Sequence, residues 1–119
     1  MNMTTRQTGS VTIVDINGRV VIEECNSLRD LLSNLLAAGN KEILLNLAGA
    51  NRFDTVGLAC LIRGLVSIRK QQGELKLLNP TKNVREVLRL TKLDTVFDIH
   101  EDEAAAVMSF SVKPAAAST

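Results

Sequence analysis

Residues 43–68 read ILLNLAGANRFDTVGLACLIRGLVSI. The apolar run over 43–47 is typical of a central strand that is covered on both faces of a sheet. A polar corner follows it, and beyond Thr55 leucine and isoleucine recur at helical spacing. A strand that leads through a polar corner into a helix presents backbone N–H groups at the helix N-terminus, where a negative group is favoured. The stretch therefore predicts a β–α unit with a candidate site at its corner.

Strands and helices are also expected on both sides of this unit. The β-rich runs 11–16 and 19–22 flank Asn17-Gly18, a dipeptide that favours a tight hairpin turn. A leucine stripe that follows Ser27 predicts a capped helix ending near Gly39. Beyond residue 70 the pattern predicts a strand over 74–78, a helix over about 82–92, a short strand over 95–99 and a helix that begins near 101–103.

This order predicts a single α/β domain. Its mixed sheet would begin with an antiparallel hairpin, continue with parallel βαβ units and pack against about four helices. A chain of 119 residues suits one domain and one core. We expect residues 1–9 to be a loose N-terminal segment, 10–111 the folded domain and 112–119 a flexible tail.

The composition argues against nucleic-acid and membrane binding. The net charge is +1, and the chain has three Phe but no Trp or Tyr for base stacking. No apolar run reaches the roughly 18 residues of a membrane span, and the N-terminus has no signal-peptide pattern. Cys25 and Cys60 are isolated in the sequence. We therefore expect a cytoplasmic protein with two reduced thiols.

Catalytic and metal-binding patterns are absent from the sequence. His100 is the single histidine and is expected at the surface, while Gly57 and Gly64 do not form a phosphate-binding loop. A phosphoryl-accepting receiver domain would need clustered acids at the end of its first strand, whereas a turn is predicted at Asn17-Gly18. We expect no enzyme activity, no metal and no cofactor.

Asp54 and Thr55 carry the remaining chemistry. Either residue can cap the helix that follows, which is worth about 1 kcal/mol. Alternatively, Thr55 is an exposed hydroxyl that a kinase can reach, and a phosphate there would add about −1.5 to −2 charges. The helix dipole would tolerate that charge, so the domain would stay folded while an interface over the corner is disrupted.

The segment 44–58 resembles the signature of STAS domains, the anti-sigma factor antagonists. That signature is an apolar strand, an Asp-Leu pair and then Asp-Ser-Ser/Thr-Gly-Leu-Gly at a helix start. The resemblance covers nearly the whole chain, including 75–80 and the closing pattern over 84–102, of which 87–97 is especially similar.

The resemblance implies a binding module switched by phosphorylation. Such a domain binds an ATP-dependent serine/threonine kinase that is also an anti-sigma factor and thereby frees a sigma factor for transcription. Phosphorylation ends the interaction and a protein phosphatase restores it. Thr55 falls on the acceptor position and Asp54 on the preceding acid. The implied partner-binding residues are Arg52, Asp54, Thr55, Val56, Gly57 and Leu58.

Several positions depart from the family pattern. Asn46 replaces an Asp at a strand end, Arg52 replaces an apolar residue, Val56 replaces a second hydroxyl and Ala59 replaces a glycine. The segment 18–21 also lacks the usual acid. These changes predict a less acidic and more basic acceptor corner, and hence a partner surface unlike that of the best-known kinases.

Two other functions are consistent with the same resemblance. One is a structural STAS subunit, without phosphorylation, of a bacterial lipid-transporter or stress-signalling scaffold complex. The other is a small-ligand carrier with a pocket between sheet and helices. The oligomeric state, the sigma factor and the kinase stay open at this point.

Overall fold

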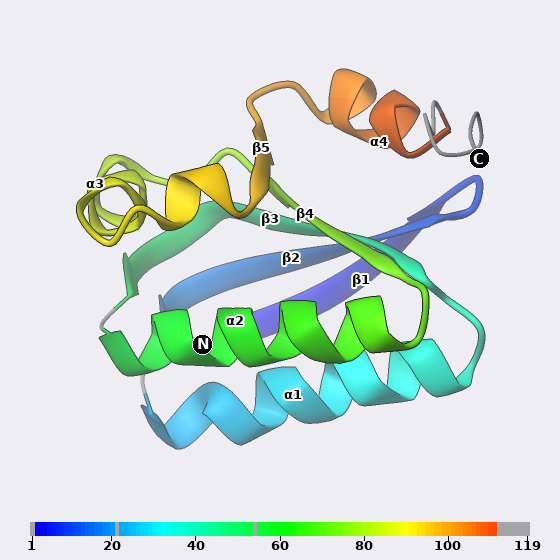
Figure 1. Cartoon of the computed structure of the whole chain (residues 1–119), viewed down its shortest axis with the longest axis horizontal. Coiled ribbons are helices and arrows are strands. Elements are labelled where there is room, and N and C mark those ends of the chain that lie inside the picture. The colour runs from blue at the N-terminus through cyan, green and yellow to red at the C-terminus, as the bar shows by residue number, and fades with distance from the viewer. Residues whose placement is uncertain (1, 21, 54, 112–119) are drawn as a thin grey trace.

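The computed structural model describes residues 2–20, 22–53 and 55–111; within these ranges the side chains of 20, 22–25, 51–53, 55, 56 and 111 are not described. Strands and helices alternate along most of the chain (Figure 1). In order they are β1 (Asn2–Thr8), β2 (Val11–Val20), α1 (Ile22–Ala37), β3 (Glu42–Phe53), α2 (Thr55–Lys70), β4 (Glu74–Leu78), α3 (Lys82–Leu90), the 3-10 turn η1 (Leu93–Thr95), β5 (Asp98–His100) and α4 (Glu103–Ser111).

The five strands form one sheet in the order β1-β2-β3-β4-β5. β1 pairs antiparallel with β2, and each later pair is parallel. This arrangement confirms the predicted mixed sheet. Figure 1 shows α1 and α2 side by side on one face of the sheet and α4 on the opposite side.

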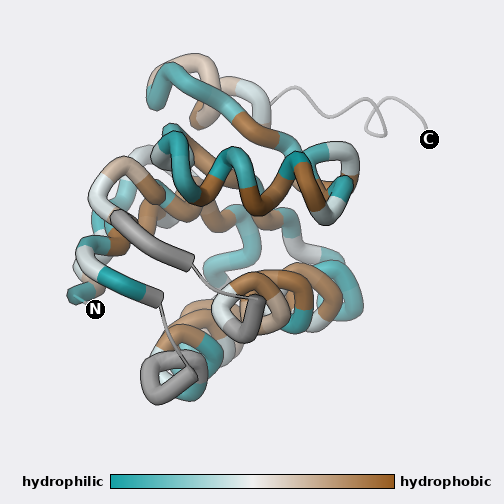
Figure 2. Tube along the Cα trace, turned by 90° about the vertical axis from the view of Figure 1, so that its left-hand side faces the viewer, coloured by the Kyte–Doolittle hydropathy of each residue, from teal (hydrophilic) through white to brown (hydrophobic). Residues whose placement is uncertain are grey.

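The core has two parts because side chains of successive strand residues point to opposite faces. In β3, Ile43 and Leu45 belong to the large cluster that packs against α1 and α2, whereas Leu44 belongs to a small cluster with Phe110 of α4. All three β3 side chains are fully buried, which confirms a central strand covered on both faces. Hydrophobic and hydrophilic positions alternate along the helices in Figure 2, as one-sided burial requires.

The initial hairpin lies earlier in the chain than predicted. β1 and β2 are joined at Gly9, which has a φ of 60°, and β2 continues through Asn17-Gly18. The pairing of β2 with β3 shifts register between Asp15 and Asn17 and again after Gly18. The positive φ of Gly18, 98°, therefore serves an irregularity within a strand, and the turn predicted there is wrong.

Residues 2–8, predicted to be loosely ordered, form the edge strand β1. Their sequence is polar because β1 is largely exposed, so it lacks the apolar alternation that marks a buried strand. The full-length ladder with β2 holds the strand in place. Arg6 adds a side-chain link, with its Nε 2.6 Å from Asp15 Oδ2.

Other element boundaries differ by a few residues from the expected ones. α1 begins at Ile22, so Ser27 lies inside the helix and is not its cap. Residues 93–95 form η1, and the last strand is consequently limited to Asp98–His100. The predicted tail over 112–119 lies outside the described residues.

Cys60 lies in the second turn of α2, where it is buried and disulfide-bonded. The reduced thiol predicted for this residue is therefore wrong. The chain's other cysteine, Cys25, stands in the first turn of α1, and its side chain lies outside the described set. A disulfide depends on tertiary proximity, which spacing along the chain does not reveal.

Candidate functional site

The candidate site is the corner between β3 and α2. β3 ends at Phe53 and α2 begins at Thr55, so one residue separates strand from helix. The N-terminus of α2 consequently lies at the carboxyl edge of the parallel strands, where ligand and partner sites of open α/β sheets are commonly found. Asp54, the residue between the two elements, lies outside the described residues.

Two other elements border this corner. The end of β2 pairs with the end of β3, with Arg19 opposite Arg52 and Val20 opposite Phe53 along the backbone. On the other side, Thr81 precedes α3; its hydroxyl donates to the carbonyl of Ala50, at 3.0 Å, and accepts from the N–H of Val84. These contacts hold the start of α3 against β3, so the corner rests on a fixed frame.

Gly49 contributes to the same frame. A Cβ added at this position would lie 1.8 Å from Oδ1 of Asn17, a distance that no side chain could tolerate. The absence of a side chain at Gly49 lets that of Asn17 cross β3 where the β2–β3 register shifts. The end of β3 that leads into the corner is therefore shaped by Asn17 and Gly49 together.

The six predicted partner-binding residues divide into two groups. Gly57 and Leu58 are buried; Leu58 is 4 % exposed and belongs to the large core cluster, so its side chain holds α2 against the sheet. Arg52, Thr55 and Val56 have described backbones within β3 and α2, but their side chains are outside the described set, as is all of Asp54. Their partner-binding roles and the phosphorylation of Thr55 stay predictions.

The electrostatics of α2 favour an anion at its first turn. The first N–H groups of any α-helix lack intrahelical acceptors and carry the positive end of the helix dipole. Residues 55–58 include no acid, while Arg69 and Lys70 occupy the last turn, where cations complement the dipole. A phosphate at the start of α2 would therefore meet a favourable local field.

Asn46 has a structural partner that the sequence did not reveal. Its Nδ2 donates to Asp15 Oδ1 at 2.7 Å, and its Oδ1 accepts from the N–H of Ala48. Asp15 in turn pairs with Arg6, whose hydrogen bond, followed by that of Asn46, lowers the pKa of the carboxyl group. An Asp at position 46 would place a second carboxylate beside that of Asp15, whereas the amide of Asn46 donates a hydrogen bond to it. The departure of Asn46 from the family pattern therefore suits the neighbouring Asp15.

Asn46 is also distant from the acceptor corner. It precedes Phe53 by seven positions in β3, which corresponds to about 20 Å along a strand. Charge at that distance is largely screened by salt, and the effect of Asn46 on the acidity of the corner stays a prediction. Thr81, whose hydroxyl is bonded next to the corner, was missed; its position just before the predicted helix at 82 is the signal that could have identified it.

Residues 2–106 match the STAS domain family. The chain belongs to this family. A search of curated proteins found no match. Among solved structures, the fold is similar to that of Thermotoga maritima TM1081, provisionally described as an anti-sigma factor antagonist, with 25% identity, coverage of 90% of this chain and 92% of that chain, and a TM-score of 0.83.

Two further anti-sigma factor antagonists share the STAS fold with this chain. The protein from Mycobacterium paratuberculosis is 17% identical, with 91% and 92% of the two chains covered and a TM-score of 0.80. Unphosphorylated SpoIIAA, a Bacillus cell fate determinant, is 17% identical, with 94% and 99% covered and a TM-score of 0.77. At this identity the two likenesses establish the fold alone.

In residues 2–20, 22–53 and 55–111, no cluster of three or more His, Cys, Asp or Glu could hold a metal ion. His100, expected at the surface, is partly buried, with Nε2 3.1 Å from Asp98 Oδ2. None of the helices in the described part of the chain is sufficiently long and apolar for a membrane span.

Proposed function

We propose that this STAS chain is an anti-sigma factor antagonist. It binds a serine/threonine kinase that serves as an anti-sigma factor, and phosphorylation of Thr55 switches the interaction off. The observation that carries the proposal is the place of Thr55 as first residue of a helix that begins directly after β3, in a chain of this family. The chain is then a substrate and binding module, not an enzyme, and ATP belongs to its partner.

The switch follows from the chemistry of the added group. The kinase transfers the γ-phosphoryl group of ATP to Thr55 Oγ1, so a new P–O bond forms as the bond to ADP breaks and the hydroxyl proton is released. The phosphate brings about −1.5 to −2 charges to the corner. The α2 N-terminus stabilises that charge within the domain. In contrast, a partner surface that fits a neutral hydroxyl would have to accommodate the phosphate at the cost of like-charge repulsion or of removing water from the charged group, so binding is weakened.

Of the predicted partner-binding residues, Arg52, Asp54, Thr55 and Val56 are proposed to form the partner surface at the carboxyl edge of the sheet, with Gly57 and Leu58 buried behind them. Arg52 adds a positive charge, which an acidic group of the kinase would complement. The buried Leu58 acts beneath this surface, since it fixes the direction of α2. A cytoplasmic location follows from the proposed partner, and a protein phosphatase would regenerate the active form.

The first test is the modification itself. Protein purified from its native host is examined by intact-mass and peptide-mapping mass spectrometry, with and without phosphatase treatment. The expected result is one phosphate per chain, mapped to Thr55 and removed by phosphatase. A host culture in which the chain is abundant yet never modified at Thr55, in any growth condition, would contradict the switch.

The second test is the effect of charge at Thr55 on partner binding. Wild-type protein and Thr55→Ala are expected to retain a host protein of the kinase anti-sigma class, and Thr55→Glu to lose it. Thr5→Glu is the matched control, because Thr5 is exposed on β1 and its substitution introduces the same charge elsewhere. Equal retention by Thr55→Glu and wild type would overturn the switch, and co-purification with a transporter ATPase would favour the structural-subunit function.

A further inference from the structure

A repeated pair of residues lies on α1 and α2. Arg29 is followed four residues later by Ser33, and Arg63 is followed four residues later by Ser67. Residues four apart lie on the same face of a helix. Each helix therefore presents an arginine and a serine in line along one face, with the arginine nearer the N-terminus.

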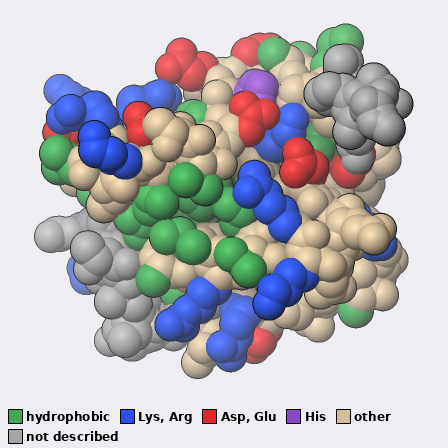
Figure 3. Space-filling view, in the orientation of Figure 1, with side chains coloured by type: hydrophobic (Ala, Val, Ile, Leu, Met, Phe, Trp, Pro, Cys, Tyr) green, Lys and Arg blue, Asp and Glu red, His purple; other side chains and the backbone are tan. Residues whose placement is uncertain are grey.

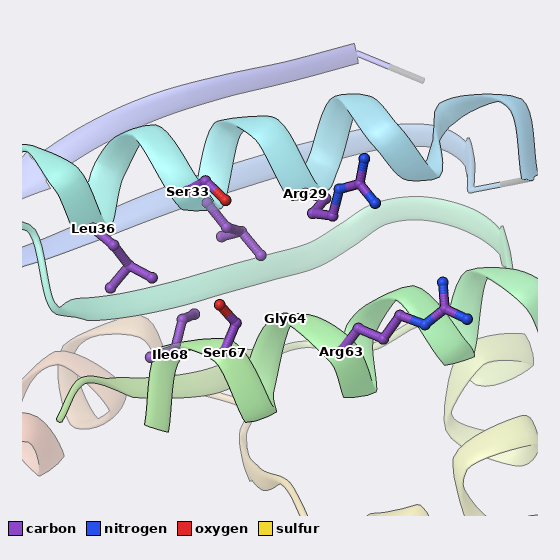
Figure 4. A pocket seen from close by; sticks show the side chains of 8 residues that line it. Arg29, Ser33, Leu36, Arg63, Gly64, Ser67 and Ile68 are labelled. Carbon is purple, nitrogen blue, oxygen red and sulfur yellow. The ribbon is translucent and has the colours of Figure 1, made fainter. Parts of the chain in front are cut away.

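The packing of the two helices brings these pairs together. α1 and α2 both return from parallel strands, so they run in the same direction and lie side by side (Figure 1). A groove of about 110 Å³ lies between them. Figure 4 shows the two arginines at one end of this seam, one on each helix, and the two serines one turn further along, with the serine hydroxyl groups directed toward each other.

The floor of the groove is apolar and tightly closed. Leu32, Leu36 and Ile68 line it, and the last of these is fully buried. Gly64 lets the helices approach, because a Cβ added there would lie 2.9 Å from Cδ1 of Leu32. Hydrogen bonds formed over such a floor are shielded from water on one side, which strengthens those made by a guanidinium group.

The charges in this groove are not compensated within the described part of the chain. There, Arg6, Arg85 and Arg89 each pair with a carboxylate, whereas Arg29 and Arg63 have no ion pair or side-chain hydrogen bond. Lys70 extends the basic character, since it lines an adjoining groove together with Arg63. Figure 3 shows several Lys and Arg side chains close together where α1 and α2 lie side by side. Like charges that share a cleft repel each other and together attract an anion.

We propose that the seam between α1 and α2 binds a phosphate-type oxyanion, which Arg29 and Arg63 hold from two sides with Ser33 and Ser67 as additional donors. A tetrahedral dianion offers oxygens to two planar guanidinium groups at once, a geometry that arginine serves better than lysine. The group is either free inorganic phosphate or the terminal phosphate of a small metabolite.

This site is separate from the proposed switch. Arg63 lies eight residues beyond Thr55, which is about 12 Å along the helix, so a phosphate on Thr55 is not its ligand. Oxyanion binding in the seam therefore requires neither phosphorylation nor a kinase. The two proposals can fail independently.

Thermal unfolding tests the site with the unmodified chain. Sodium phosphate is compared with sodium chloride at matched ionic strength, and glucose 6-phosphate is added as a monoester. For wild type, phosphate is expected to raise Tm by roughly 2 °C when its concentration reaches its Kd. A larger rise with glucose 6-phosphate identifies a metabolite as the source, and an equal or smaller rise identifies free phosphate; both results support the site.

Substitutions locate the effect. Arg63→Gln and Arg29→Gln are each expected to abolish the phosphate-specific rise, whereas Arg69→Gln, an exposed change on the same helix outside the groove, is expected to preserve it. In ¹H–¹⁵N NMR, the amides of Ser33, Gly64 and Ser67 are expected to shift with phosphate. A Tm rise equal in chloride, an equal loss in Arg69→Gln, or NMR shifts confined to the first turn of α2 would each overturn the proposal.

Discussion

The face of the sheet under α1 and α2 is packed with leucine and isoleucine, whereas the face under α4 combines a small apolar cluster with charged side chains. On the first face, buried residues from three strands and three helices form one continuous cluster. On the second, six buried residues suffice, and Phe110 of α4 is the largest. Most of the apolar burial therefore stabilises the first face.

Polar contacts complete the second face. Lys76 of β4 is 7 % exposed; its Nζ donates to Ser109 Oγ, lies 3.1 Å from Asp98 Oδ2 and stands 4.7 Å from the ring centre of Phe110. Arg6 joins Asp15 of β2 to Glu103 of α4. The contacts of α4 with the sheet thus include hydrogen bonds and ion pairs of charged side chains in addition to apolar packing.

The difference between the faces matters for function. The candidate corner and the arginine seam both belong to the helix layer of the large apolar cluster, whose packing does not depend on charge. A phosphate bound or attached there can change the surface without unpacking the core. Both proposed sites therefore lie where the fold is least sensitive to an added charge.

The largest effect is expected from the apolar face. Leu45→Ala removes a fully buried side chain from the centre of the large cluster, and we expect a loss of about 2–5 kcal/mol in the free energy of unfolding. Urea denaturation measures it. Val66→Ala is the control, since Val66 is 47% exposed and its truncation should cost far less. Equal losses would break the claim that this face dominates stability.

The second effect probes the polar face. Asn46→Asp places a carboxylate against Asp15 and removes the donated hydrogen bond, so we expect a loss of about 1–3 kcal/mol at neutral pH. Asn34→Asp, an exposed change on α1, is the matched control. The double variant Asp15→Asn with Asn46→Asp should recover most of the loss. No recovery would mean that the two side chains are not coupled.

Acid should weaken the polar face next. The hydrogen bond from Arg6 lowers the pKa of Asp15 below its ordinary value of 3.8. The stability that this group contributes is complete above that value and is lost as the pH falls through the lower pKa of the folded state. Unfolding free energies measured from pH 6 down to 2 should fall less steeply for Asp15→Asn than for wild type. Identical slopes would contradict the pairing.

The smallest effect is expected at Lys76. Replacing a buried ion pair by an apolar side chain of similar length is often neutral, and Asp98 is 53% exposed, so its charge would remain hydrated. Lys76→Met should change the unfolding free energy by less than about 1 kcal/mol, while Lys76→Ala should cost more through lost packing on Phe110. A large loss in Lys76→Met alone would show that the charge itself holds α4.

The sequence predicts the apolar half of this molecule better than the polar half. The run over 43–47 and the leucine stripe of α2 are buried as expected, because periodic hydrophobicity reports burial directly. The turn predicted at Asn17-Gly18 is wrong because a glycine with positive φ can occur in an irregular part of a strand as readily as in a turn. β1 was missed because an exposed edge strand has no apolar alternation.

The candidate site could be only partly predicted. Thr55 at a helix start follows from local sequence, and the structure begins α2 there. The bond between Asn46 and Asp15 joins residues 31 apart, and the seam requires α1 and α2 to pack in register. Tertiary neighbours of this kind cannot be deduced from spacing along one chain.

The sequential strand order has a consequence for how the chain acquires its fold. Each strand pairs with the one just before it, so an emerging polypeptide can extend the sheet in the order of synthesis. The Arg6–Glu103 pair is different, because it joins residues 97 positions apart. Such a distant contact has the highest loop-closure cost and waits for the last helix. We therefore expect the contact between the first strand and the last helix to form late in folding, after the sheet that both elements pack against.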